Sequence, residues 1–196
     1  MEFRVLGEPA DPEGDWAGEA VFVSRAALRQ RRDPHEVAAA VPGAEVLPGG
    51  LIRIVVAHPG ELLGAEPGAV PQGEWPDLPR TWDNPGFVVR YAHVRALNTE
   101  RWAAELGVAR EPFRGELLDG VWDRRVLRVL AELPARQGAR NGGWASYSVR
   151  LALAYHDAHE RAPAVPKGDE PASALHTARV RLAEAVRKVL PGPDRL

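Results

Sequence analysis

Residues 84–97 of this 196-residue chain read NPGFVVRYAHVRAL, and they carry its strongest local signal. Phe87, Tyr91, Val94 and Leu97 recur at helical spacing, which predicts a helix with one apolar side packed against a core. The arginines of this stretch lie mostly off that side, so we expect them to face solvent or phosphate. Taken alone, the stretch predicts an amphipathic helix.

The segments that follow also have the periodicity of helices. We expect helices over residues 116–133 and 144–160 and a last helix after Pro171, ended by Pro191-Gly192-Pro193. Ser173 is the expected N-cap of the last helix, because a serine before an apolar-periodic run satisfies a free backbone N–H. The second half of the chain therefore predicts an all-helical bundle.

The first half mixes strands and helices. Residues 3–6 and 51–56 are short and rich in β-branched residues, which predicts two strands, and residues 16–30 and 34–41 between them predict two helices. Pro34 fits a first helical turn after an Asp33 cap. We therefore expect an α+β fold: a small α+β layer followed by the bundle.

A run rich in proline and glycine separates the two halves. Residues 64–80 hold Pro67, Pro71, Pro76 and Pro79, a composition typical of a semi-extended linker. The predicted organisation is an α+β domain at 1–63, a linker at 64–81 and a helical bundle at 82–196.

The order of these segments resembles that of arginyl-tRNA synthetases. Gly14-Asp15-Trp16, residues 33–38 and the predicted strand after Pro48-Gly49 resemble segments of their N-terminal domain. Residues 84–97 resemble the start of their DALR anticodon-binding domain. The resemblance covers residues 10–63 and 82–190, and the joint order makes it specific. It implies tRNA as a partner, with arginine tRNA among the candidates.

The catalytic part of that family has no counterpart between the two halves. The chain contains neither a His-x-Gly-His-type signature nor a Lys-Met-Ser-Lys-type loop, and its two lysines, Lys167 and Lys188, lie outside any phosphate-binding loop. We therefore expect a protein that makes no aminoacyl-adenylate, is not an enzyme and uses no cofactor.

Charge is distributed unevenly along the chain. Residues 1–80 hold 7 Lys and Arg against 13 Asp and Glu, and residues 81–196 hold 18 against 14, so the two parts carry −6 and +4. The positive charge is almost all arginine, which suits phosphate contacts and base stacking, although arginine is also common on ordinary solvated faces. The absence of cysteine and of long apolar stretches predicts a cytoplasmic protein without a membrane segment or a secretory signal.

Eight residues are the candidate RNA contacts. Tyr147 has two readings, since it falls on the buried side of its helix but a tyrosine at the rim of a bundle can stack on a base. Where the family reads a D-loop base with an aromatic residue and an Asn, this chain has Leu51 and Arg53. The candidates are Arg53, Arg90, Arg95, Tyr147, Arg179, Arg181, Arg187 and Lys188.

The histidines offer little catalytic chemistry. His156 and His159 lie three residues apart on a predicted helix, which two metal ligands could share, but no His-Glu-x-x-His order or cysteine completes a site. We predict no metal site there, and a packing or capping role for His93.

Two functions remain open. The first is a non-catalytic tRNA adaptor or carrier. The second is a scaffold that has lost RNA binding and contacts a protein partner, such as a synthetase or a biosynthetic or modifying enzyme. RNA binding should weaken steeply with salt, whereas a protein interface need not.

Overall fold

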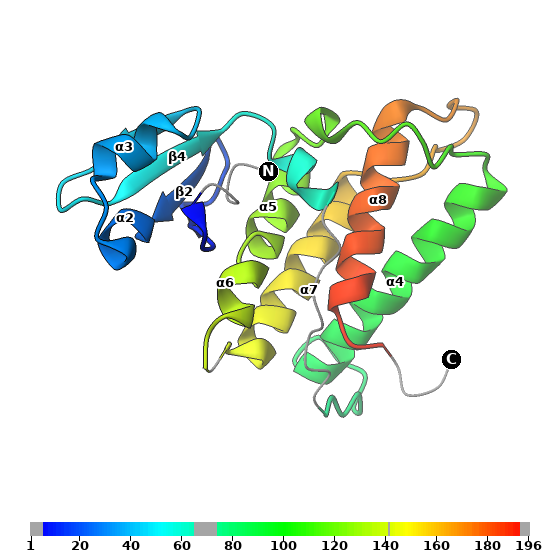
Figure 1. Ribbon diagram of the computed structural model, residues 1–196. Helices are drawn as coiled ribbons and strands as arrows, with labels where there is room; N and C mark the ends of the chain where they lie inside the picture. Colours follow the sequence, from blue (N-terminus) through cyan, green and yellow to red (C-terminus); the bar gives the residue numbers. More distant parts are fainter. Residues whose placement is uncertain (1–5, 65–73, 141, 193–196) are drawn as a thin grey trace.

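A computed structural model of the chain describes residues 6–64, 74–140 and 142–192 and confirms the α+β class. A small antiparallel sheet with two short helices forms the first part, and helices make up the rest (Figure 1). None of the helices in these described ranges is long and apolar enough to cross a membrane.

The sheet has four antiparallel strands in the order β1-β2-β4-β3. They are β1 (Asp11–Glu13), β2 (Ala20–Ser24), β3 (Ala44–Val46) and β4 (Ile52–Val56). Phe22 pairs with Ile54 at the centre of the sheet, and alternate residues of β2 and β4 are buried. This alternation is the pattern of a sheet with one face on the core.

The prediction of a helix over residues 16–30 was wrong for most of its length. Residues 20–24 form β2, and only α2 (Ala26–Gln30) is helical. β2 is held by pairing with β4, about thirty residues later, a non-local interaction that a local pattern does not report. The strand prediction at 51–56 is confirmed by β4, whereas residues 3–5 lie outside the described ranges and Leu6 is not in a strand.

The second short helix follows its predicted start. α3 (Pro34–Ala39) begins with Pro34, and the Asp33 side chain accepts a hydrogen bond from His35 N at 2.9 Å. The cap and the proline satisfy the first turn, as expected.

In the described residues of the bundle there are five α-helices: α4 (Pro85–Glu105), α5 (Val121–Leu130), α6 (Leu133–Gln137), α7 (Trp144–Arg161) and α8 (Ala174–Val189). α4 packs against both α7 and α8 (Figure 1). The predictions for α7 and α8 are confirmed, and the Ser173 side chain caps α8 by accepting from His176 N. The helix predicted over 116–133 is instead a short 3-10 helix, η2 (Gly115–Leu117), followed by α5, with Gly120 as the N-cap of α5.

The buried face of α4 differs from the predicted one. Val88, Ala92, Ala96 and Ala103 are buried, whereas the aromatic side of the helix is only half-buried. Alanines suit this position because α4 contacts two helices at once, and small side chains permit close approach. The large side chains are consequently left at the surface.

The two parts of the chain meet through polar and backbone contacts. The 3-10 helix η1 (Pro59–Gly64) packs on η2, where a Cβ on Gly60 would lie 2.1 Å from Gly115 O. From α5, Arg124 Nη1 donates to Gly18 O at 2.6 Å and Arg128 Nε to Gly14 O at 2.8 Å. The division into domains stays a prediction, and residues 65–73 of the predicted linker lie outside the described ranges.

Candidate nucleic-acid interface

The start of α4 is fixed by three consecutive residues. The Asn84 side chain accepts hydrogen bonds from Gly86 N at 2.9 Å and Phe87 N at 3.5 Å, and Pro85 occupies the first turn. A Cβ on Gly86 would lie 2.1 Å from Pro76 O, so only glycine fits there. Asn-Pro-Gly therefore sets both the start of the helix and the course of the segment that precedes it.

Four aromatic rings gather at this end of α4, and we call them the aromatic cluster: Trp82, Phe87, Tyr91 and His156. Phe87 and Tyr91 stack with their ring centroids 5.3 Å apart and their planes 13° apart. Trp82 lies edge-on to Phe87, Tyr91 and His156 at 6.1, 6.0 and 5.0 Å. Trp82 is 55% exposed, so the cluster presents an indole to solvent.

Arg95 joins the aromatic cluster on its helical side. Its guanidinium carbon lies 4.6 Å from the centroid of the Tyr91 ring, and Nη1 lies 3.1 Å from Glu160 Oε1 and 3.2 Å from His156 Nδ1. The side chain is 18% exposed. Arg95, one of the predicted contacts, therefore braces the aromatic cluster and makes an ion pair with Glu160.

The hydrogen bonds of His156 identify its proton. Its Nδ1 accepts from Arg95, so Nε2–H donates to Val88 O at 3.0 Å. Burial lowers the pKa of His156 and of His159, which favours the neutral form of both imidazoles. His159 Nδ1 lies 3.5 Å from Thr99 Oγ1. Within the described ranges, no group of three or more His, Asp or Glu side chains could hold a metal ion.

His93 has the predicted capping role. Its Nδ1 lies 3.0 Å from Leu190 O, the carbonyl that follows α8. Burial lowers its pKa. The side chain thus ties α4 to the end of α8.

Arg53, the predicted contact on the sheet, is enclosed by two carboxylates. Nη2 lies 2.9 Å from Glu19 Oε2 and Nη1 3.0 Å from Glu45 Oε1, and the hydrogen bond that Arg53 donates to Glu19 raises the arginine pKa. Leu51 precedes β4 and is half-buried. The local charge around Arg53 is negative, which does not favour a phosphate.

Arg179 and Arg187 of α8 are held inside the bundle. Arg179 donates to both carboxylate oxygens of Asp123, which is 1% exposed, and to Pro163 O. Arg187 pairs with Glu100 of α4. These two arginines join helices to each other.

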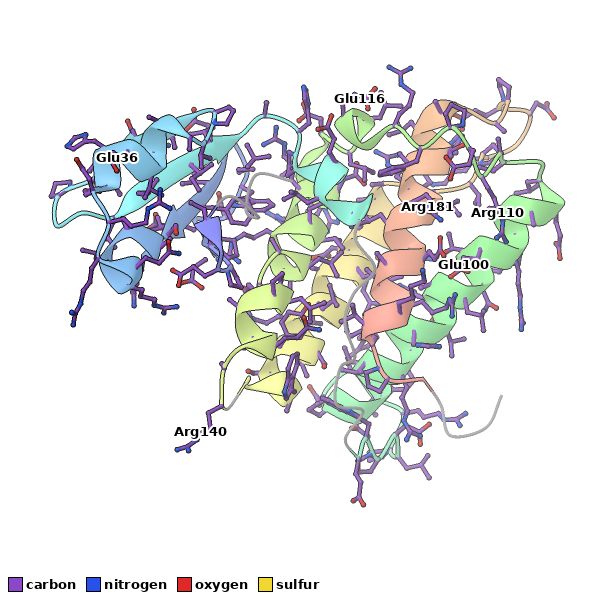
Figure 2. The ribbon with its side chains drawn as sticks, viewed as in Figure 1. Glu36, Glu100, Arg110, Glu116, Arg140 and Arg181 are labelled. Carbon is purple, nitrogen blue, oxygen red and sulfur yellow. The ribbon has the colours of Figure 1, made fainter. Side chains whose placement is uncertain are left out.

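Arg181 and Lys188 share Glu184 on the outer side of α8. Arg181 Nη1 lies 2.8 Å from Glu184 Oε2 and Lys188 Nζ 3.3 Å from Glu184 Oε1. Figure 2 shows Arg181 on α8 beside α4, the helix that carries Glu100.

The last two predicted residues lie apart from these. Tyr147 has no exposed surface, and its ring lies beside Trp144 and under Arg136. Its buried position agrees with the core reading and leaves no face for a base. Arg90 lies half-buried on α4, one residue before Tyr91 of the aromatic cluster.

Several arginines outside the eight candidates lie exposed, with no carboxylate within 4 Å among the described residues. Figure 2 shows one of them, Arg140, projecting away from the bundle. Arg125 stacks on Trp122, which also lies under Arg161. The sequence around these exposed arginines does not distinguish them from the arginines that pair with carboxylates. They are Arg25, Arg31, Arg32, Arg101, Arg110, Arg125 and Arg140.

The sequence of the chain is similar to those of two arginine–tRNA ligases. The chain is 39% identical over 116 residues, 57% of its length, to the arginine–tRNA ligase of Clavibacter sepedonicus. It is 34% identical over 113 residues, 55% of its length, to that of Paenarthrobacter aurescens strain TC1. The matched stretch spans 21% of each ligase. No protein-family model matches the chain, and no solved structure does.

The chain therefore contains a region similar to part of an arginine–tRNA ligase. Over more than half of its length it shares ancestry with these enzymes, but it corresponds to only about a fifth of each. The resemblance stated from the residues alone is thus supported in its coarse form.

Proposed function

We propose that this protein is a non-catalytic tRNA-binding protein that contacts unpaired bases through the aromatic cluster at the start of α4. The observation that carries the proposal is the exposed Trp82 indole, which is held by three further rings, with Arg95 over the Tyr91 ring of the same cluster. The relatedness to arginine–tRNA ligases makes tRNA the favoured RNA.

The geometry of the aromatic cluster suits single-stranded RNA. Unpaired bases are bound by stacking on aromatic side chains and arginine, at about 1–3 kcal/mol for each base. Trp82 is positioned by its edge contacts, so little rotamer freedom is lost when a base stacks on it. A buried ring such as Tyr147 cannot act in this way.

The exposed cations supply the phosphate contacts. Arg101 and Arg110 lie at the far end of α4 and beyond it, and Arg181 and Lys188 lie on the neighbouring α8. A phosphodiester can approach Arg101, Arg110 and Arg181 without breaking an ion pair buried in the bundle. These residues would position the RNA, and the aromatic cluster would contact its bases.

The direct test is a gel-shift titration of the purified protein against arginine tRNA, a different tRNA and a polyadenylate strand. At about 150 mM salt, non-specific contacts are weak, so saturable binding of either tRNA in preference to polyadenylate supports the proposal. A preference for arginine tRNA names the ligand, and equal binding of both tRNAs indicates recognition of shape. No binding of any RNA contradicts the proposal.

A protein partner is the second candidate, and the ion pairs favour it. Arg53, Arg179 and Arg187 are engaged by carboxylates, which removes charge that RNA would use. Leu78 and Leu153 are 72% and 47% exposed. The two functions differ in salt dependence, since an RNA complex weakens in proportion to the number of phosphate contacts.

A further inference from the structure

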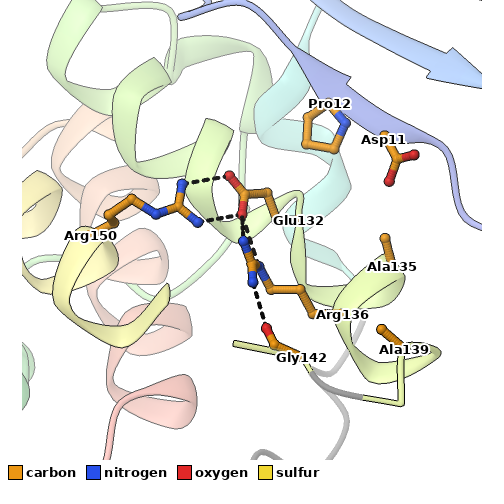
Figure 3. A pocket seen from close by; sticks show the side chains of 8 residues that line it. All are labelled: Asp11, Pro12, Glu132, Ala135, Arg136, Ala139, Gly142 and Arg150. Atoms are coloured by element: carbon orange, nitrogen blue, oxygen red, sulfur yellow. Dashed lines mark hydrogen bonds and ion pairs between the residues drawn. The ribbon is translucent and has the colours of Figure 1, made fainter. Parts of the chain in front are cut away.

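A pocket lies where the sheet meets the bundle, away from the aromatic cluster. It has a volume of about 510 Å³, a size typical of small-molecule sites. One side is formed by Asp11 and Pro12 of β1 and the other by α6, the start of α7 and the chain between them. Figure 3 shows Arg136 and Arg150 in the pocket wall, both bonded to Glu132.

Three guanidiniums converge on the single carboxylate of Glu132. Arg128 and Arg150 donate to Oε1, each at 2.8 Å, and Arg136 and Arg150 donate to Oε2, each at 2.6 Å. Burial raises the pKa of Glu132, but hydrogen bonds from the three arginines outweigh burial and lower it to about 2. The carboxylate is therefore ionised, and both of its oxygens accept hydrogen bonds from arginines.

The ion-pair cluster at Glu132 holds more cations than anions. Arg128, Arg136 and Arg150 share the one carboxylate of Glu132; of the three arginines, Arg136 and Arg150 line the pocket, together with Glu132 and the exposed Asp11. Arg128, Arg136 and Glu132 are 21%, 25% and 12% exposed, so part of this excess is withdrawn from water. Unmatched charge that is partly buried is costly and favours the capture of an anion.

Donors remain available on the open side. Arg150 is 46% exposed, and in the described part of the chain its Nε has no hydrogen-bond partner. The guanidinium carbon of Arg136 lies 5.1 Å from the centroid of the Tyr147 ring, which places Tyr147 beside the same group of charges. Its buried hydroxyl also lacks a hydrogen-bond partner in the described ranges. In the described part of the chain, Arg150 Nε and the Tyr147 hydroxyl are therefore polar groups without a hydrogen-bond partner within the protein.

We propose that this pocket binds the phosphate group of a ligand, a phosphomonoester or phosphodiester, through Arg150 and Arg136. Guanidinium forks match phosphate oxygens in geometry and charge. Glu132 holds the arginines in place and also competes with the ligand for their N–H groups. The site lies between β1 and α6, so an occupant would contact both parts of the chain.

The test is a titration of the purified protein with inorganic phosphate at constant ionic strength, followed by calorimetry and by the thermal midpoint. We expect saturable binding and a rise in Tm that chloride does not reproduce. Arg150→Gln should weaken phosphate binding about tenfold. Arg114→Gln is the matched control, because Arg114 is a similarly exposed arginine outside the pocket that pairs with Glu116, and it should bind as the wild type does.

The variant Glu132→Gln tests whether the cluster is a phosphate site or only a set of structural ion pairs. With the competing carboxylate neutralised, phosphate should bind several-fold more tightly and raise the Tm of this variant more than that of the wild type. If Glu132→Gln does not fold, the comparison of Arg150→Gln with Arg114→Gln decides. The proposal is overturned if the wild type responds to ionic strength alone, or if Arg150→Gln and Arg114→Gln bind phosphate equally.

The tRNA affinity of Arg150→Gln shows whether the bound phosphate belongs to an RNA backbone or to a small ligand. Loss of tRNA affinity together with competition by inorganic phosphate assigns the site to the RNA backbone. Unchanged tRNA affinity assigns it to a small phosphorylated ligand. The phosphate titration itself contains no RNA, so a failure of the tRNA-binding proposal leaves its outcome unaffected.

Discussion

Arg179 of α8 and Asp123 of α5 form a two-pronged ion pair: Nη2 lies 3.1 Å from Oδ2, and Nε lies 3.2 Å from Oδ1. Asp123 is 1% exposed and the Arg179 side chain 17%. The pair joins two helices that are far apart in the chain, and it explains why a residue with the sequence character of an RNA contact is absent from the surface.

Replacing Arg179 should destabilise the protein in a pH-dependent way. Burial raises the pKa of Asp123, and hydrogen bonds from Arg179 oppose that rise, so in Arg179→Met the pKa rises further. A carboxyl whose folded-state pKa is raised stabilises the fold while protonated, and this contribution is lost as pH rises through the folded pKa. We expect a loss of about 3–5 kcal/mol at pH 8 and a smaller loss at pH 5, measured by urea unfolding.

The matched control for that experiment is Arg181→Met. Arg181 pairs with Glu184 three residues away and its side chain is 39% exposed, so the change should be below about 1 kcal/mol at either pH. Equal losses for Arg179→Met at pH 5 and pH 8 would contradict the role given to Asp123.

Exchanging the charges of Arg187 and Glu100 should restore stability that the single change Arg187→Glu removes. Both side chains are largely buried between α4 and α8, at 29% and 17% exposed. Arg187→Glu places two carboxylates together and should cost about 1–3 kcal/mol of stability. Adding Glu100→Arg should recover at least half of that loss in thermal or urea unfolding. A double variant no more stable than Arg187→Glu alone would show that the ion pair does not hold these helices together.

Gly86 should be intolerant of any side chain. In Gly86→Ala, the new methyl group would meet the Pro76 backbone, so either that segment or the start of α4 has to shift, at about 1–3 kcal/mol. Such a shift also moves Trp82, so tRNA affinity should fall. Gly18→Ala is the control, since a Cβ there has no atom within 4 Å, and it should leave the melting temperature and the tRNA affinity unchanged.

The parts of the fold that were predicted correctly rest on local signals. Asn84-Pro85 marks the start of α4, Ser173 caps α8, and Asp33-Pro34 opens α3. Each signal acts within one helical turn, so it can be read from neighbouring residues. The strand β2 was mistaken for helix because its pairing partner β4 lies far along the chain.

The site was harder to predict because its contacts are distant in sequence. Trp82 meets His156 across 74 positions, and Arg187 meets Glu100 across 87. An arginine in a helix pattern looks the same whether or not a carboxylate reaches it from another helix. One available signal was the alanine stripe of α4, which marks a tightly packed face and places Phe87 and Tyr91 toward the surface.

The most direct test of RNA binding through the aromatic cluster compares the tRNA affinities of Trp82→Ala and Trp102→Ala. Both indoles are about half exposed, at 55% and 47%, but only Trp82 belongs to the aromatic cluster. Loss of one stacked base costs about 1–3 kcal/mol, so Trp82→Ala should bind about 5- to 150-fold more weakly, with Trp102→Ala within about twofold of the wild type. Equal affinities for the two folded variants would contradict the account.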